Sequence, residues 1–176
     1  MSEKNMYSRS DDYRKKYLSK HKGVLGIYTC SYCGKLCTKS GMQVDHIYPI
    51  NGAKTKVIGK LWVKINTWYL PKEKRNQGIN GVWNTTSACP TCNRIKSDLG
   101  GVWVWRGYVG RILFPIMNVV LIGLLMKGLF VTIFYNDVPY LTKVVFLNVL
   151  FRIISYILRN DLINVKSLKK LIMFKK

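Results

Sequence analysis

The chain contains two Cys-x-x-Cys pairs, Cys30 with Cys33 and Cys89 with Cys92, and this spacing is typical of cysteines that hold a zinc ion. Each pair forms a tight turn, and a tetrahedral ion joins two such turns from distant segments of the chain. Closely spaced cysteines also form disulfides in secreted proteins, but residues 1–22 are polar and basic and lack the apolar segment of a signal peptide. We therefore predict a structural Zn²⁺ site made by these four cysteines.

An Asp-His dipeptide lies between the two cysteine pairs, and an asparagine directly follows the second pair. Hydrolysis of a phosphodiester needs a base that deprotonates water and a cation that neutralises charge in the transition state. The imidazole of His46 titrates near neutral pH and suits the base, whereas Asp45 and Asn93 offer hard oxygen ligands for Mg²⁺ or Mn²⁺. A lone histidine is usually solvated or packed, but the place of His46 after Asp45 and between the pairs favours a catalytic role.

One further cysteine and one further histidine lie outside these motifs. Cys37 follows the first pair by four residues and is expected to be a buried thiol rather than a substitute ligand. His21 is the other histidine of the chain, and we expect it to be solvated.

Three short elements must position the candidate residues. Residues 43–49 alternate in polarity and are rich in β-formers, which predicts a strand that ends at Pro49, and a second short strand is expected around residues 82–83. Pro90 suits a first helical turn and predicts a helix over residues 91–98. A strand, a long loop, a second strand and a helix give an α+β fold of ββα-metal layout.

With these residues, the chain resembles the zinc-bracketed HNH endonucleases of phages and mobile elements over residues 30–98. The resemblance implies that His46 is the general base, that Asp45 and Asn93 hold the catalytic cation, and that Asn84 is the middle residue of the motif. The last position is an asparagine instead of the literal histidine, which is a familiar variant in that family. Five features carry the resemblance in order: the first Cys-x-x-Cys, Asp45-His46 followed by Pro49, Asn84, the second Cys-x-x-Cys, and Asn93-x-x-Lys96.

Asn84, Arg94 and Lys96 each have two interpretations. The amide of Asn84 holds either the loop after the first strand or the imidazole, or else this residue only caps a turn in its polar run. Arg94 and Lys96 either contact the phosphates of nucleic acid or are solvated surface charges.

The segment between the two strands, residues 51–81, is long for this motif and interleaves basic with aromatic side chains. This pattern predicts an insertion that contacts DNA, with cations on phosphates and rings against sugars or bases. Alternatively, the aromatic residues form a small core and the lysines are solvated. The lysines assigned to DNA are Lys54, Lys56, Lys60 and Lys64, and the aromatic residues are Trp62, Trp68 and Tyr69.

The chain of 176 residues is strongly basic, with 29 Lys and Arg against 8 Asp and Glu and a formal charge of +21. Such a charge favours polyanionic partners through counterion release, and DNA is the simplest partner of this kind. No small-molecule substrate is indicated, because the sequence has no glycine-rich phosphate loop. We divide the chain into a basic arm (1–22), an HNH nuclease domain (23–110) and a hydrophobic helical region with a basic tail (111–176).

The composition turns apolar after residue 111, and residues 112–135 contain a single charge, on Lys127. This stretch is long enough to cross a bilayer core of about 30 Å. A turn signal over residues 136–139 and a second apolar stretch over residues 140–158 complete a predicted transmembrane hairpin with its basic flanks in the cytoplasm. The second stretch carries polar residues along one side, which alternatively indicates an amphipathic helix on the membrane surface. Burial of both stretches in a soluble helical domain of about 65 residues is disfavoured by its size.

Three functions are compatible with these patterns. The first explains most of the residues and is a metal-dependent DNA endonuclease, anchored to the inner face of a membrane through residues 112–158. The second is a non-catalytic zinc-knuckle module that binds nucleic acid, for which the Asp-His pair and Asn93 would be coincidental. The third is a membrane-active protein whose hydrophobic hairpin is the functional part.

Overall fold

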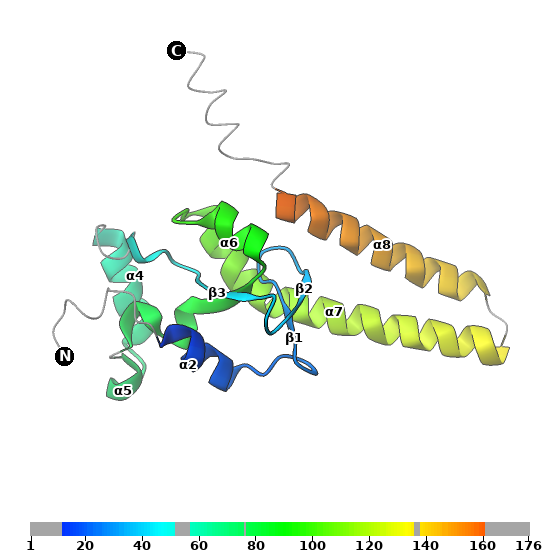
Figure 1. Cartoon of the computed structure of the whole chain (residues 1–176), viewed down its shortest axis with the longest axis horizontal. Helices are drawn as coiled ribbons and strands as arrows, with labels where there is room; N and C mark the ends of the chain where they lie inside the picture. The colour runs from blue at the N-terminus through cyan, green and yellow to red at the C-terminus, as the bar shows by residue number, and fades with distance from the viewer. Residues whose placement is uncertain (1–11, 52–56, 76, 136–137, 161–176) are drawn as a thin grey trace, which may run out of the picture. The chain divides into compact units, whose positions relative to one another are not determined.

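The structure is a computed structural model that describes residues 12–51, 57–75, 77–135 and 138–160 (Figure 1). The chain divides into two compact units, Met1–Asn118 and Val119–Lys176. In its described part, the first unit combines helices with two small antiparallel sheets, and the second unit is helical. The predicted α+β class is therefore confirmed. The first unit ends inside a helix at Asn118, although the composition changes near residue 110.

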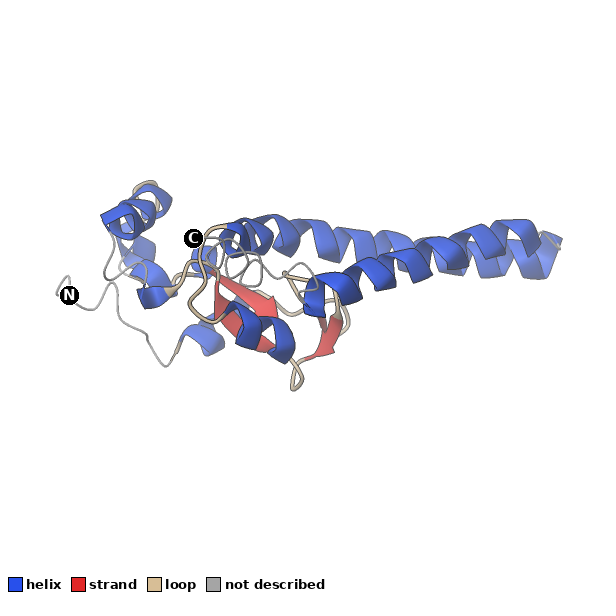
Figure 2. Cartoon of the chain, turned by 90° about the horizontal axis from the view of Figure 1, so that it is seen from above, coloured by secondary structure: helices blue, strands red, loops and turns tan. Residues whose placement is uncertain are grey.

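In the described residues, the strands of two small sheets alternate with helices along the chain, and Figure 2 distinguishes strands from helices by colour. The elements are α2 (Tyr13–Lys20), β1 (Ile27–Thr29), β2 (Leu36–Thr38), β3 (Gln43–His46), α4 (Val57–Thr67), α5 (Lys72–Arg75), the 3₁₀ turns η1 (Gly78–Asn80) and η2 (Val82–Asn84), β4 (Thr85–Ala88), α6 (Pro90–Lys96), α7 (Val102–Tyr135) and α8 (Val138–Asn160).

The strand that carries the Asp-His pair belongs to the second sheet. β3 pairs antiparallel with β4, so that His46 lies opposite Thr85 and Gln43 lies opposite Ala88. The first predicted strand is thus confirmed over residues 43–46. The second predicted strand was misplaced, because residues 82–83 form the turn η2, in which Asn84 N donates to Gly81 O at 2.9 Å. Pairing begins only at Thr85, after this turn.

Helix α6 follows β4 directly and begins at Pro90. Proline is favourable in the first turn because its missing N–H has no helical partner there. Cys89 caps the helix through its sulfur, which accepts a hydrogen bond from Cys92 N at 3.4 Å. The predicted helix is confirmed, and it ends at Lys96 because Ser97 adopts a positive φ of 44°, which is incompatible with further helix.

The insertion between β3 and β4 is helical where the sequence predicted a long loop. One face of α4 is buried, and Val63 packs with Ile79 against Tyr48, Ile50 and Trp83. This small apolar cluster explains why a helix forms here, since helices in proteins depend mainly on packing of an apolar face.

The aromatic residues of the insertion were predicted either to contact DNA or to form a small core, and the structure divides them into one packed ring and two exposed rings. The Trp62 ring lies 6.3 Å from that of Tyr48 and 6.1 Å from that of Tyr108, measured between centroids, so it belongs to the core of the first unit. Trp68 and Tyr69 are exposed instead. The exposed pair remains available to a partner.

The first turns of α7 are part of the first unit, and the helix begins ahead of the apolar stretch predicted from residue 112. Arg106 donates to Tyr32 O at 2.8 Å, Arg111 donates to Trp83 O at 2.8 Å, and Asn118 donates to Gly34 O at 3.0 Å. These side chains fasten α7 to the backbone of three earlier segments.

The second unit contains the remainder of α7 together with α8, which turns back along it (Figures 1 and 2). A Cβ at Gly128 would lie 3.2 Å from the Leu141 side chain, so the two helices approach closely there. Both helices are long and apolar enough to cross a membrane, and 17% of the apolar window of each is buried. Large exposed side chains cover their outer faces, among them Ile122, Phe130, Ile133, Phe146, Val149 and Ile153.

The close packing of the first turns of α7 within the first unit can be tested at Gly110. A Cβ added at Gly110 would overlap Ser31 O, which is a backbone atom and cannot rotate away. We expect Gly110→Ala to destabilise the chain by roughly 1–3 kcal/mol, as overpacking of a core does. The measurement is the denaturant midpoint of the full chain, followed by tryptophan fluorescence. The control is Gly123→Ala on the same helix, where an added Cβ meets nothing within 4 Å. An unchanged midpoint for Gly110→Ala would contradict the packing.

Candidate metal centre and active site

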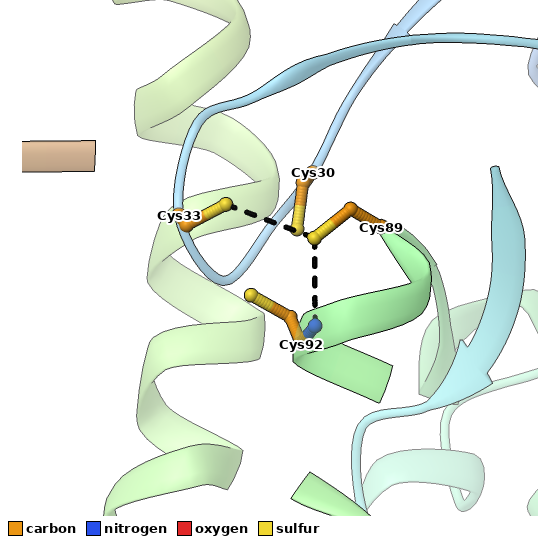
Figure 3. Close-up of side chains that lie close together, drawn as sticks. All are labelled: Cys30, Cys33, Cys89 and Cys92. Atoms are coloured by element: carbon orange, nitrogen blue, oxygen red, sulfur yellow. Dashed lines mark hydrogen bonds between the residues drawn. The ribbon is translucent and has the colours of Figure 1, made fainter. Parts of the chain in front are cut away.

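The two cysteine pairs come together in the first unit, although more than fifty residues separate them. The four sulfurs point toward one another (Figure 3), all four residues are buried, and every sulfur lies within 4.8 Å of the others. Tetrahedral zinc with bonds of about 2.3 Å separates its ligands by about 3.8 Å, and Cys33 Sγ lies 4.0 Å from Cys89 Sγ. The four cysteines are therefore positioned to bind a metal ion and fit structural zinc.

The four thiols differ, and Cys89 is one whose surroundings favour the thiolate. Hydrogen bonds from Cys30, and then from Cys33 and Cys92, lower the pKa of Cys89. Thiolates are the form in which cysteine binds metal.

Cys37 lies outside this cluster and is buried. Its thiol donates to Lys35 O at 3.8 Å, and burial raises its pKa to about 11. Cys37 is therefore a protonated thiol at neutral pH and is not one of the grouped sulfurs.

Asp45 is held by two donors that reach the same oxygen. Tyr32, which lies between the first two cysteines, donates its hydroxyl to Asp45 Oδ2 at 2.6 Å, and Lys96 Nζ lies 3.0 Å from that oxygen. Burial, together with the carboxylate, raises the pKa of Tyr32 well above its usual value, so its hydroxyl keeps its proton. Both contacts use Oδ2, so Oδ1 is the oxygen with which this carboxylate would bind a cation.

Lys96 differs from its expected role as a surface charge or phosphate contact. Its side chain is 1% exposed, and its ammonium also donates to His46 O at 2.7 Å. A buried ammonium needs such partners, because removal of an ionised group from water is costly. Lys96 therefore fixes the end of β3 from α6.

His46 is 7% exposed and lies at the end of β3. Its Nε2 lies 3.2 Å from Asn80 Oδ1, and its ring lies 4.6 Å from the ring of Tyr13 on α2. An amide oxygen can only accept, so this contact places the proton of neutral His46 on Nε2 and the lone pair on Nδ1. Neither Asn80 nor Tyr13 was found from the sequence, because both approach His46 through the fold alone.

Asn84 holds the loop after β3 rather than the imidazole. Its Oδ1 accepts from Tyr48 N at 2.8 Å, and its Nδ2 donates to Tyr48 O at 3.1 Å and to Ile79 O at 3.0 Å. The side chain is fully buried. Asn84 thus joins the segment after His46 to the turn that carries Asn80.

Asp45, His46 and Asn93 line a single cavity of 380 Å³ between β3 and α6. Asn93 Nδ2 donates to Gln43 Oε1 at 2.6 Å, so its Oδ1 is the atom that a cation would take. Sequence reasoning missed Asp98, which lines the same cavity and accepts from Asn51 at 2.8 Å. Exposed carboxylates give little sequence signal when they lie outside a motif.

The cations predicted to bind DNA differ in their positions. Arg94 is exposed and lines the cavity. Lys60 and Lys64 are exposed on α4. Lys54 and Lys56 lie outside the described residues.

Comparison of the chain with protein-family models, with curated proteins and with solved structures found no match.

We expect the full chain, purified from a zinc-containing medium without chelator, to carry about one zinc per molecule, as a four-thiolate site requires. Cys92→Ser should lose this zinc and lower the unfolding midpoint, because binding and folding of such sites are coupled. Cys37→Ser is the matched control and should keep the metal. Elemental analysis by mass spectrometry gives the stoichiometry, and an intact mass that shows two disulfides in place of zinc would contradict the assignment.

Proposed function

We propose that the first unit is a metal-dependent DNA endonuclease of the HNH type. The observation that supports the proposal is the cavity that Asp45, His46 and Asn93 line together, a set that contains one imidazole, one carboxylate and one amide. The order of β3, β4 and α6 also agrees with a ββα arrangement, and two of the four buried thiols, Cys89 and Cys92, lie at the start of α6. A base and a cation-binding pair in one cavity are the minimum that phosphodiester hydrolysis needs.

The chain's own residues account for the proton transfer. His46 Nδ1 takes a proton from a water molecule while Nε2–H is held by Asn80. The oxygen of that water forms a bond to phosphorus, the bond to the 3′ oxygen breaks, and the departing oxygen leaves with the electron pair and is protonated from solvent. The Tyr13 ring lies against the imidazole and restricts its orientation. Asn84 fixes the backbone that follows His46.

Asp45 and Asn93 would hold the divalent cation through their Oδ1 atoms. Carboxylate and amide oxygens suit Mg²⁺ or Mn²⁺. When bound, this cation would neutralise charge that develops on the phosphate. The ammonium of Lys96, 3.0 Å from Asp45, reduces the negative charge that the site offers. The site by itself would therefore bind the cation weakly. The phosphate of the substrate would supply further oxygen ligands.

DNA is the substrate that the charge of the chain favours, since the formal charge is +21. Arg94 lies exposed at the cavity, and Lys60 and Lys64 are exposed on α4. Contacts from these cations to phosphates would position a strand without reading its sequence.

One observation favours a second candidate, a zinc module that binds nucleic acid without cutting it. Lys96 already neutralises Asp45, as it would if the carboxylate served only to join α6 to β3. The imidazole of His46 would then be a packed side chain.

We further propose that the apolar helices anchor the nuclease to the cytoplasmic face of a membrane. The exposed apolar faces of α7 and α8 would be unfavourable in water at this extent. Basic residues lie before the first apolar stretch and after the second, and these flanks favour the cytoplasmic side.

His46→Ala tests the catalytic proposal in the full chain with supercoiled plasmid and Mg²⁺ or Mn²⁺. We expect the variant to cut at a rate lower by about 10²–10⁴, the usual contribution of a general base. Zinc content should stay at the wild-type value. Added imidazole should restore part of the activity of His46→Ala, because it replaces the base that was removed.

Undiminished cleavage by His46→Ala would exclude this mechanism. A wild-type chain that binds the plasmid but cuts with neither cation would support the binding module instead.

Extraction of cell membranes with alkaline carbonate tests the anchor. We expect the full chain to stay in the membrane pellet, and Phe130→Asp to reduce the pelleted fraction. Phe130 is exposed in the later part of α7, and a charge in a spanning helix is unfavourable on insertion, by up to about 2.5–3.5 kcal/mol at the helix centre. Lys39→Asp, at an exposed site of the first unit, is the control and should remain in the pellet. Release of the wild-type chain into the soluble fraction would exclude a spanning hairpin.

A further inference from the structure

A second cavity, of 540 Å³, lies within the first unit and is not part of the candidate active site. It is formed by the end of α2, the loop after it, β1, β4 and the first turns of α7. We call it the cationic groove, after the basic residues that line it: Lys20, His21, Lys22 and Arg111.

The positive charge of the groove comes from three separate segments. Lys20 and Lys22 are exposed on either side of His21, and Arg111 enters from α7. Burial, followed by the charges of Arg111 and Lys20, lowers the pKa of His21, so these cations act on a common point. Within the described part of the chain, no acidic residue lines the groove. An anion there would relieve repulsion among groups that the fold brings together.

The groove also holds donors for a ligand. Thr85 is 2% exposed, and its hydroxyl has no hydrogen-bond partner among the described residues. A buried polar atom without a partner is costly and often marks a site for a water or a ligand. Arg111 uses Nη1 for Trp83 O at 2.8 Å, which fixes a guanidinium whose remaining donors suit a phosphate.

The rest of the lining is apolar and aromatic. Tyr17 and Tyr28 are buried, Trp83 is half-buried, and Ile27 and Pro115 complete the wall. Cations beside an aromatic and aliphatic wall match a ligand that joins a phosphate to a sugar and a planar base.

We propose that the cationic groove binds a nucleotide of the same DNA strand that passes through the candidate active site. The phosphate lies among Lys20, Lys22 and Arg111, and the sugar and base pack on the wall beside Trp83. This assignment rests on the proposed function for the identity of the strand, and it adds a binding site outside the Asp-His cavity.

The position of the groove supports a continuous strand. Thr85 in the groove lies directly opposite His46 in the β3–β4 pair. Helix α2 reaches both cavities, since Tyr13 lies over His46 and Lys20 lines the groove. Seven residues of helix rise about 10 Å, close to the rise of three nucleotides in a B-form strand at about 3.4 Å each.

The test measures binding without cleavage. The full chain in detergent carries His46→Ala, no divalent cation is added, and the probe is a fluorescein-labelled oligo-dT of about 12 nucleotides, within the usual range of single-strand sites. We expect Lys20→Ala to weaken binding by about threefold to tenfold and to lower the salt slope by about one, as loss of a phosphate contact does. Thr85→Val, which keeps the shape and removes the hydroxyl, should also weaken binding. Lys39→Ala removes an exposed charge outside both cavities and should bind as the parent does.

A second readout reports on the groove itself. The imidazole signals of His21, followed by NMR, should titrate at higher pH when the oligonucleotide is bound, because a nearby phosphate favours the charged form. Lys20 on α2, Lys22 in the following loop and Arg111 on α7 are the charged groups that face this ring.

The outcomes separate this inference from the nuclease proposal. Oligonucleotide binding that Lys20→Ala and Thr85→Val leave unchanged would overturn the groove, even if the wild-type chain cuts DNA. Groove-dependent binding by a wild-type chain that never cuts would retain the groove and overturn the nuclease. Binding to vesicles of anionic lipid is measured with the same variants. If Lys20→Ala and Thr85→Val lose vesicle binding but keep oligonucleotide binding, the groove would be assigned to lipid headgroups and the proposal would be overturned.

Discussion

The grouping of four buried thiols is the constraint on which the first unit depends. It joins the turn after β1 to the start of α6, two segments that share no strand pairing with each other. The same two segments deliver the partners of Asp45, because Tyr32 lies between Cys30 and Cys33 and Lys96 lies one helical turn after Cys92. A metal ion at the thiols would therefore also set the position of the carboxylate in the candidate active site.

The buried Lys96 charge explains how so small a site keeps its shape. Loss of one partner of an ion pair that is shielded from water strongly destabilises the folded protein. Here the ammonium of Lys96 also donates a hydrogen bond to His46 O. On the other side of the loop, Asn84 bonds to both backbone groups of Tyr48. The end of β3 is thus held from α6 and from η2, which leaves the imidazole little freedom. Preorganisation of this kind is what the proposed role of His46 as general base requires.

Helix α7 changes in character along its length. Its first turns are bonded to the first unit by Arg106, Arg111 and Asn118, whereas its later turns expose large apolar side chains. The β3–β4 pair likewise borders two cavities. His46 on β3 lines the candidate active site, and Thr85 on β4, which pairs with His46, lines the cationic groove. A proposed membrane anchor and a proposed strand-binding groove would therefore share the same helix, since Arg111 belongs to both α7 and the groove.

The sequence by itself determined the features that depend on local spacing. Two Cys-x-x-Cys pairs indicated the metal centre, Pro90 marked the start of α6, and long apolar stretches indicated α7 and α8, because each pattern acts within a few neighbouring residues. Tertiary structure alone decided which distant groups meet. The contact of Asn80 with His46, the burial of Lys96 and the start of β4 at Thr85 all depend on packing across tens of residues. The helical insertion formed for the same reason, since its apolar face gains stability only against Ile79 and the residues packed around it.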